Sequence, residues 1–239
     1  MNYGHHFALL AQYAYYEPDH AVVAYSDLGY DNVTFITKRN TQCYIMESKD
    51  KVVIAVRGTE VSCTDDIFSD LKFIRRKSNT KGGVHVGFFD DANEIWSAIN
   101  DYIANPSRSS KKLWICGHSL GGAIACILAS RLPFKTAACY TYGCPRVGNK
   151  RWAKSQRTVH HRYVNNNDIV PRIPPVWLWF RHYGELIYIN YYGHVRKLTP
   201  WQRTKDRIRG IIRAWQKGEP FDTFRDHGIE YYVKYLRDQ

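Results

Sequence analysis

Residues 117–121 read Gly117-His118-Ser119-Leu120-Gly121 and fit the pattern G-x-S-x-G. In this pattern the serine lies on a sharp turn between a strand and a helix, and its Oγ projects from strained backbone. Small neighbours two residues away on either side avoid a collision with the strand and the helix. The helix directs its N-terminal N–H groups at the serine, which favours negative charge there. We therefore predict Ser119 as a nucleophile, with Gly117, His118 and Gly121 forming the turn.

The sequence on both sides of this pattern adds weight to it. Glycine and serine are common, so five residues alone are weak evidence. The letters L-W-I-C precede the turn and read as a strand, and A-I-A-C-I-L-A follows it and reads as a buried helix. The alternative is a glycine-rich turn that binds phosphate or has no function. The strand and helix context favours the nucleophile.

A serine nucleophile needs a base and an acid, and in enzymes with this turn the chain order is Ser, then Asp or Glu, then His. Asp168 follows T-V-H-H-R-Y-V-N-N-N, a predicted strand, and precedes I-V-P-R, so it lies where a strand leaves the sheet. It would fix the imidazole and stabilise its charged form. Asp206 and Asp222 have charged surroundings and fit less well, and an ordinary Asx turn is the alternative for Asp168.

The same order leaves three histidines as candidates for the base: His182, His194 and His227. His227 stands in Arg-Asp-His-Gly, just before an amphipathic C-terminal stretch. The order alone does not choose among the three.

The negative oxygen of an acyl-transfer intermediate needs two backbone donors. The residue after the nucleophile supplies one of them, so we expect the N–H of Leu120 in this role. The second should come from a loop after an earlier strand.

The elements that position these groups alternate along the chain. Apolar periodicity predicts strands over 33–38, 43–47, 51–57, 112–116, 136–142 and 158–164, and helices over 5–16, 64–74, 88–104, 123–131 and 149–156. This alternation predicts an α/β fold with a mostly parallel central sheet and helices on both faces. The length of 239 residues suits a single domain over 1–239.

Five motifs in order resemble the class 3 lipases, the fungal triacylglycerol lipase-like α/β hydrolases and their bacterial-type relatives. They are G-H-S-L-G-G-A at 117–123, R-G-T at 57–59, H-V-G-F at 85–88, T-Y-G-C-P-R-V-G-N at 141–149 and N-N-N-D-I-V-P-R-I-P-P at 165–175. The resemblance implies the α/β-hydrolase fold and a lipase activity. It also places the acid at Asp168, the base at His227 and the second oxyanion donor at Thr59.

The resemblance bears on two further features. It gives His85 a structural role near the site. It also places a mobile lid at 65–74, and a fixed packed helix is an equal alternative there.

A basic segment dominates the charge of the chain. The chain has a net charge of +12. The segment 146–217 alone carries +13, from 16 lysines and arginines against three acids, so the rest of the chain is close to neutral. Such a segment attracts anionic partners or is simply a solvated face. Within it, 199–217 is a basic amphipathic helix that could lie on an anionic membrane or pack its apolar face on the domain; we favour packing. No helix-turn-helix, zinc or RNA-recognition signature is present, so nucleic acid is not an expected partner.

The sequence also sets expectations about location and cofactors. The N-terminus lacks the features of a secretory signal and no apolar run is long enough to cross a bilayer, so we expect a cytoplasmic location with peripheral membrane contact. The six cysteines should be reduced and buried. The pairs His5-His6 and His160-His161 lack companions at metal-ligand spacing, so we expect neither a metal nor another cofactor.

The prediction is therefore a serine hydrolase that cleaves lipid esters, with acylglycerols as the first choice of substrate. A phospholipase A1-type enzyme and a short-chain esterase are alternatives. A non-catalytic lipid- or protein-binding module is the alternative of another class. The sequence does not indicate the oligomeric state.

Overall fold

The structure of the chain is a computed structural model that describes residues 2–58, 73–216, 218 and 225–239. The predicted helix and lid over 64–74 and the predicted donor Thr59 lie almost wholly outside the described residues. Only Phe73 and Ile74 of that stretch are described, and neither is helical.

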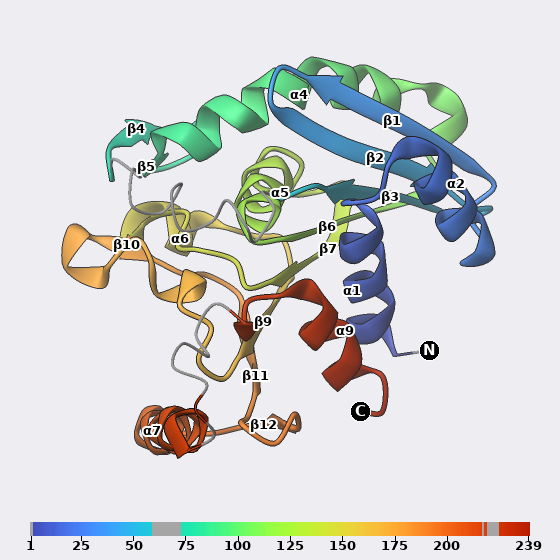
Figure 1. The fold of residues 1–239 in the computed structure, drawn as a ribbon. Coiled ribbons are helices and arrows are strands. Elements are labelled where there is room, and N and C mark those ends of the chain that lie inside the picture. Colours follow the sequence, from blue (N-terminus) through green and yellow to red (C-terminus); the bar gives the residue numbers. More distant parts are fainter. Residues whose placement is uncertain (1, 59–72, 217, 219–224) are drawn as a thin grey trace.

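An eight-stranded sheet forms the centre of the fold, in the order β1-β2-β3-β6-β7-β9-β11-β12 (Figure 1). The inner strands β3, β6, β7, β9 and β11 pair in parallel, and the other pairings are antiparallel. The strands span Asn32–Lys38 (β1), Thr41–Glu47 (β2), Lys51–Val56 (β3), Lys112–His118 (β6), Thr136–Tyr142 (β7), His160–Asn165 (β9), Glu185–Ile189 (β11) and Val195–Arg196 (β12). The predicted α/β class with a mostly parallel sheet is confirmed.

Helices cover both faces of this sheet (Figure 1). They enclose two apolar cores, one on each face. On one face α4 and α5 pack against alternate side chains of the inner strands, and on the other face α1, α2 and α9 do so. The helices span Tyr3–Tyr13 (α1), Pro18–Asp27 (α2), Val86–Ala104 (α4), Leu120–Arg131 (α5), Lys150–Ser155 (α6), Pro200–Gln216 (α7) and Ile229–Leu236 (α9). Strands buried on both faces explain why 51–57 is an almost unbroken apolar run.

Several elements were not predicted. They include α2, which begins with a proline, the inner strand β11 and the edge strand β12. A second, four-stranded sheet in the order β10-β8-β5-β4 is made of strands of two or three residues, too short for a periodic signal. These strands span Phe180–Arg181 (β10), Gly148–Asn149 (β8), Gly83–His85 (β5) and Arg75–Lys77 (β4), and the short helical turns are Pro106–Arg108 (η2), Val170–Arg172 (η3) and Val176–Leu178 (η4).

Helix α7 lies beyond β11, at the end of the sheet opposite β1 (Figure 1). Its buried residues are Asp206, Gly210 and Ala214. Its large apolar side chains are instead exposed, from 48% for Ile212 to 78% for Trp215. The prediction that the apolar face packs on the domain is therefore wrong for the described residues, because the small side chains form the packed face. None of the described helices has the length and hydrophobicity that a bilayer crossing requires.

Candidate active site

Ser119 lies at the turn between β6 and α5, where the pattern predicted it. Its backbone has φ 56° and ψ −128°, which an L-residue with a side chain rarely adopts. The Ser119 N–H donates to the carbonyl of Tyr142 (3.0 Å), and the Ser119 carbonyl accepts from the N–H of Gly122 (3.0 Å). These bonds hold the strained residue from both sides.

The two flanking glycines are required by close backbone contacts. A Cβ on Gly117 would lie 2.5 Å from the backbone of Gly121, and a Cβ on Gly121 would lie 2.3 Å from the carbonyl oxygen of Val56. Both distances are below any real Cβ contact. The requirement for small neighbours at this turn is therefore confirmed.

Three side chains from distant parts of the chain form one hydrogen-bonded row. The Ser119 Oγ lies 2.8 Å from Nε2 of His227, and Nδ1 of His227 lies 3.0 Å from each carboxylate oxygen of Asp168. A carboxylate can only accept, so Nδ1 of His227 carries the proton and Nε2 accepts from the serine hydroxyl. All three side chains are 0% exposed. The structure thus brings together the three residues predicted as nucleophile, acid and base.

Two further donors fix the Asp168 carboxylate. The N–H of Val170 donates to Oδ1 (2.9 Å), and the hydroxyl of Tyr232 donates to Oδ2 (2.6 Å). The Tyr232 oxygen in turn accepts from the N–H of Asn165 (3.0 Å). Burial and the Asp168 charge raise the pKa of Tyr232 well above its usual value, which keeps it a donor. The sequence predicts only an amphipathic stretch after His227 and gives no sign that its Tyr232 would bind the acid.

Gly143 leaves room for the contact between acid and base. Its φ is +59°, and a Cβ there would lie 2.7 Å from Oδ2 of Asp168 and 2.8 Å from Nδ1 of His227. Any side chain would push into the row itself. Gly143 belongs to the motif T-Y-G-C-P-R-V-G-N, which the sequence flagged without giving this glycine a reason.

The side chain of His118 does not bind Ser119 but binds the backbone of His227, the predicted base. Its Nε2 donates to the backbone carbonyl of His227 (2.6 Å), and its Nδ1 accepts from the hydroxyl of Tyr15 (2.8 Å). Burial, and secondarily the nearby His227 imidazole, place the pKa of His118 well below the usual value. His118 is therefore buried and hydrogen-bonded on both ring nitrogens, and its bond to His227 gives it a positioning function.

The structure describes only part of the surroundings of the two predicted oxyanion donors, Leu120 and Thr59. Leu120 is the first residue of α5, and the first N–H groups of a helix have no partner within the helix. A Cβ on Gly58 would lie 2.6 Å from the carbonyl oxygen of His118. The end of β3 therefore lies beside the turn that holds Ser119. Thr59 follows directly after Gly58 and could supply the second donor from this position, but Thr59 itself is outside the described residues.

The other candidate histidines do not reach Ser119. Nε2 of His182 donates to the carbonyl oxygen of Pro171 (2.7 Å). His194 is exposed. His85 is buried and packs on Phe88, with ring centroids 4.3 Å apart. Of the three candidates for the base, His227 is therefore the one that contacts Ser119, and His85 was not among them.

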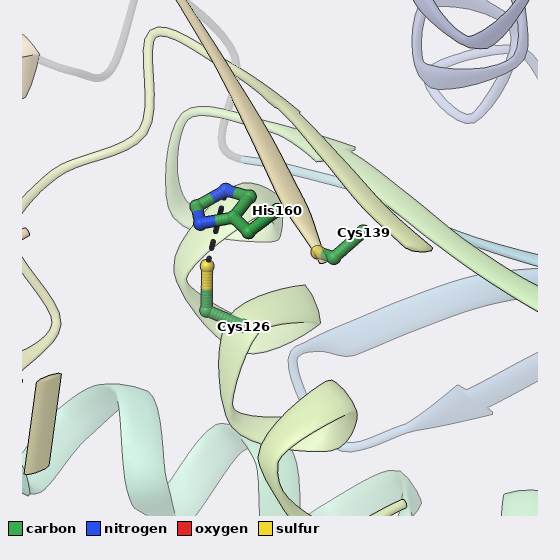
Figure 2. Close-up of side chains that lie close together, drawn as sticks. All are labelled: Cys126, Cys139 and His160. Atoms are coloured by element: carbon green, nitrogen blue, oxygen red, sulfur yellow. Dashed lines mark hydrogen bonds between the residues drawn. The ribbon is translucent and has the colours of Figure 1, made fainter. Parts of the chain in front are cut away.

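A buried group of possible metal ligands lies elsewhere on the fold (Figure 2). Cys126, Cys139 and His160 come from α5, β7 and β9, and their ligand atoms lie within 4.8 Å of one another. Thiolate and imidazole are zinc ligands, usually in sets of four. Sequence spacing missed this group because its members converge from three elements. Cys126 is seven residues beyond Ser119, about 10 Å along the helix, so the group is not part of the row.

The five described cysteines are free and buried, as predicted, and Cys63 lies outside the described residues.

Comparison with known sequences identifies the family. Residues 53–177, more than half of the chain, match the profile of the class 3 lipases. The chain belongs to the class 3 lipase family, and its fold is the α/β-hydrolase fold.

Individual relatives and a solved structure agree with this assignment. The chain is 32% identical over 198 residues to the toxin TseL of Vibrio cholerae, covering 72% of the chain and 30% of that protein. It is 31% identical over 180 residues to a secreted mono- and diacylglycerol lipase of Fusarium solani, covering 70% and 50%. A triacylglycerol lipase structure described as having a serine protease triad is 27% identical, with a TM-score of 0.66 and 79% of each chain covered. The chain thus spans half or less of the length of these two curated relatives.

Proposed function

We propose that the protein is a serine ester hydrolase that cleaves lipid esters, with acylglycerols as the principal substrates, through an acyl-enzyme on Ser119. The observation that carries this proposal is the continuous row from Ser119 through His227 to Asp168. The family membership and the mono-, di- and triacylglycerol lipases among the relatives support the substrate class.

In the first half of the reaction the Ser119 oxygen attacks the ester carbonyl carbon. His227 Nε2 takes the hydroxyl proton as the new C–O bond forms, and Asp168 stabilises the resulting imidazolium. The carbonyl oxygen becomes negative and is stabilised by the N–H of Leu120 and by a second donor that we assign to Thr59. Each such donor contributes about 3 kcal/mol to the transition state. His227 then gives its proton to the departing alcohol as the ester bond breaks.

In the second half water replaces the alcohol. His227 accepts a proton from water, which attacks the acyl carbon, and the same imidazole returns the proton to Ser119 as the fatty acid leaves. The neutral His118 beside His227 suits this cycle, because a second imidazolium there would oppose protonation of the base.

The Ser119→Ala variant tests the activity. We expect ester turnover to fall by about 10³-fold or more, because the nucleophile, base and acid act as a unit. Ser109→Ala, which changes an exposed serine in the turn before β6, at the other end of that strand from Ser119, is the matched control and should keep full turnover. A loss of less than tenfold in Ser119→Ala would contradict the proposal and favour a binding module on the same fold.

A panel of p-nitrophenyl esters from acetyl to palmitoyl, run beside triacylglycerol and phospholipid, tests the substrate class. We expect the highest kcat/KM with long acyl chains and with acylglycerols. A maximum at short chains would favour an esterase, and preferred release of fatty acid from phospholipid would favour a phospholipase A1-type enzyme.

We also propose that α7 contacts an anionic membrane surface. Its exposed side chains include Trp201, Ile208 and Trp215 together with arginine and lysine residues. An apolar and basic helix face of this kind binds the interface of anionic bilayers. Replacing Trp201 and Trp215 by Ser should weaken sedimentation with anionic vesicles at least severalfold, while p-nitrophenyl acetate turnover stays unchanged. Equal sedimentation of both proteins would contradict the contact.

A further inference from the structure

A pocket of about 550 Å³ lies between β9, β11, α7 and the loop that follows Asp168. Five arginines line it, and we call it the arginine pocket: Arg146, Arg162, Arg172, Arg203 and Arg207. Arg162 comes from β9, and Arg203 and Arg207 come from α7, so elements far apart in the sequence direct their charges into one space.

No carboxylate lies inside the pocket in the part of the chain that the structure describes, and only the Asp168 charge partly opposes the lowering of the Arg172 pKa by burial. None of the described lining residues is Asp or Glu. The nearest acids have other partners: Asp168 binds His227, and Asp206 accepts from the Tyr188 hydroxyl and the Tyr191 N–H. Five like charges in one pocket oppose folding unless an anion joins them.

The guanidinium groups also keep unused donors. Four buried nitrogen atoms have no hydrogen-bond partner among the described residues: Nε of Arg162, Nε and Nη2 of Arg172, and Nε of Arg207. Arg146 uses one nitrogen to donate to the carbonyls of Arg172 and Pro174, and Arg203 donates to the carbonyl of Leu198 (3.2 Å). Buried polar groups are normally paired, so unpaired donors on three of the arginines that line this pocket indicate a missing acceptor.

The pKa values agree with uncompensated charge. Burial lowers the pKa of Arg162 to about 10, and burial together with the charges on Arg181, Arg172 and Arg207 lowers that of Arg146 to about 10. Both groups stay charged at neutral pH, and a bound anion would reverse the shift.

We propose that the arginine pocket is a binding site for a phosphate group, presented by a phospholipid headgroup or by a small soluble phosphate ester. Phosphate suits the site because its oxygens accept from several guanidinium forks at once and its charge matches theirs. Trp177, 75% exposed, and Val176, 45% exposed, form an apolar rim at the same pocket, which suits the organic part of such a ligand. The site is independent of the proposed hydrolysis, because none of its arginines belongs to the hydrogen-bonded row.

Calorimetric titration with glycerol 3-phosphate tests the site directly. The measurement uses the full chain carrying Ser119→Ala, so that no lipid or ester is consumed. We expect saturable binding and a rise in Tm with ligand. The double variant Arg203→Gln/Arg207→Gln should weaken binding at least tenfold, and Arg207→Lys, which keeps the charge and loses the fork, should give a smaller loss.

The matched control is Lys205→Gln/Arg213→Gln, which removes the same charge from the same helix outside the pocket. It should leave the affinity for glycerol 3-phosphate within twofold of the parent. An equal loss in the two double variants would mean only general electrostatic attraction and would overturn the proposal, as would the absence of saturable binding to both the soluble and the vesicle ligand.

Vesicles distinguish the two sources of phosphate. We compare phosphatidylcholine vesicles that contain phosphatidic acid with vesicles that carry the same charge as oleate. A preference for phosphatidic acid that Arg203→Gln/Arg207→Gln abolishes and the control retains supports a lipid headgroup. Binding of glycerol 3-phosphate without that preference supports a soluble phosphate ester.

Discussion

One loop separates the hydrogen-bonded row from the arginine pocket. The charged group of the row has partners within the chain, and the charged groups of the pocket largely do not. Asp168 opens this loop and has donors from His227, Val170 and Tyr232 around its carboxylate. A few residues later Arg172 faces the arginine pocket with two unused donors. The first region is complete within the chain, as a site that must hold one geometry during catalysis requires. The second has no carboxylate among its described lining residues, as a site that awaits an anionic ligand would. Each of the four substitutions below tests one side of this contrast, in order of decreasing effect.

Asp168→Asn should have the largest effect. The amide cannot accept from Nδ1 as the carboxylate does and favours the wrong tautomer of His227, so we expect kcat to fall by about 10⁴-fold. Ester hydrolysis under saturating substrate measures this. Asp206→Asn removes a buried carboxylate outside the row and is the control. A kcat within tenfold of the wild type in Asp168→Asn would mean that the carboxylate is not needed.

Gly143→Ala should lower kcat by about 10²-fold, because the added Cβ would lie 2.7–2.8 Å from atoms of Asp168 and His227. Gly29→Ala is the matched control. Gly29 has a φ of +86° but nothing within 4 Å of its Cβ position, so this variant carries the backbone strain without the collision. If Gly143→Ala kept the same kcat as Gly29→Ala, the close contact at Gly143 would not matter for the geometry of Asp168 and His227.

Tyr232→Phe should lower kcat by about tenfold and the free energy of unfolding by about 1–2 kcal/mol. The change removes a donor from Asp168 and leaves the Asn165 N–H without its acceptor. Kinetics and denaturant unfolding measure the two effects. Tyr231→Phe, at the preceding residue of the same helix, should change neither quantity. Unchanged kcat in Tyr232→Phe would show that the other donors suffice to hold the carboxylate.

Arg162→Met should have the smallest effect of the four substitutions. It should stabilise the protein or leave its stability unchanged. A buried, unpaired guanidinium opposes folding, so its replacement by an apolar side chain should leave stability unchanged or raise it by about 1 kcal/mol. Thermal unfolding without phosphate measures this. The same variant should lose most of the Tm rise that phosphate produces. Strong destabilisation of the phosphate-free protein would show that Arg162 is already compensated within the chain.

The sequence predicted the parts of the site that depend on local pattern. The turn at Ser119 has a fixed spacing, the strand before it is a continuous apolar run, and chain order limits the acid and the base. The choice of His227 needed the family resemblance. Local pattern could not predict that Tyr232 donates a hydrogen bond to Asp168. The sequence of a helix does not indicate which distant group a tyrosine hydroxyl contacts.

The same limit explains the wrong prediction for α7 and the absence of any prediction of the arginine pocket. A helix with an apolar and a basic face is compatible with packing or with exposure. Here Gly210 and Ala214 form the packed face because close approach to the domain needs small side chains. The sequence showed a basic segment, but only the fold reveals that five of its arginines share one cavity.

The central claim is that Ser119 is activated by His227. Labelling of the intact protein with a fluorophosphonate, followed by mass spectrometry of its peptides, tests it most directly. We expect one adduct, on the peptide that holds Ser119, and a large loss of labelling rate in His227→Ala. A folded wild-type protein that never reacts, or a His227→Ala variant that reacts as fast as the wild type, would contradict it.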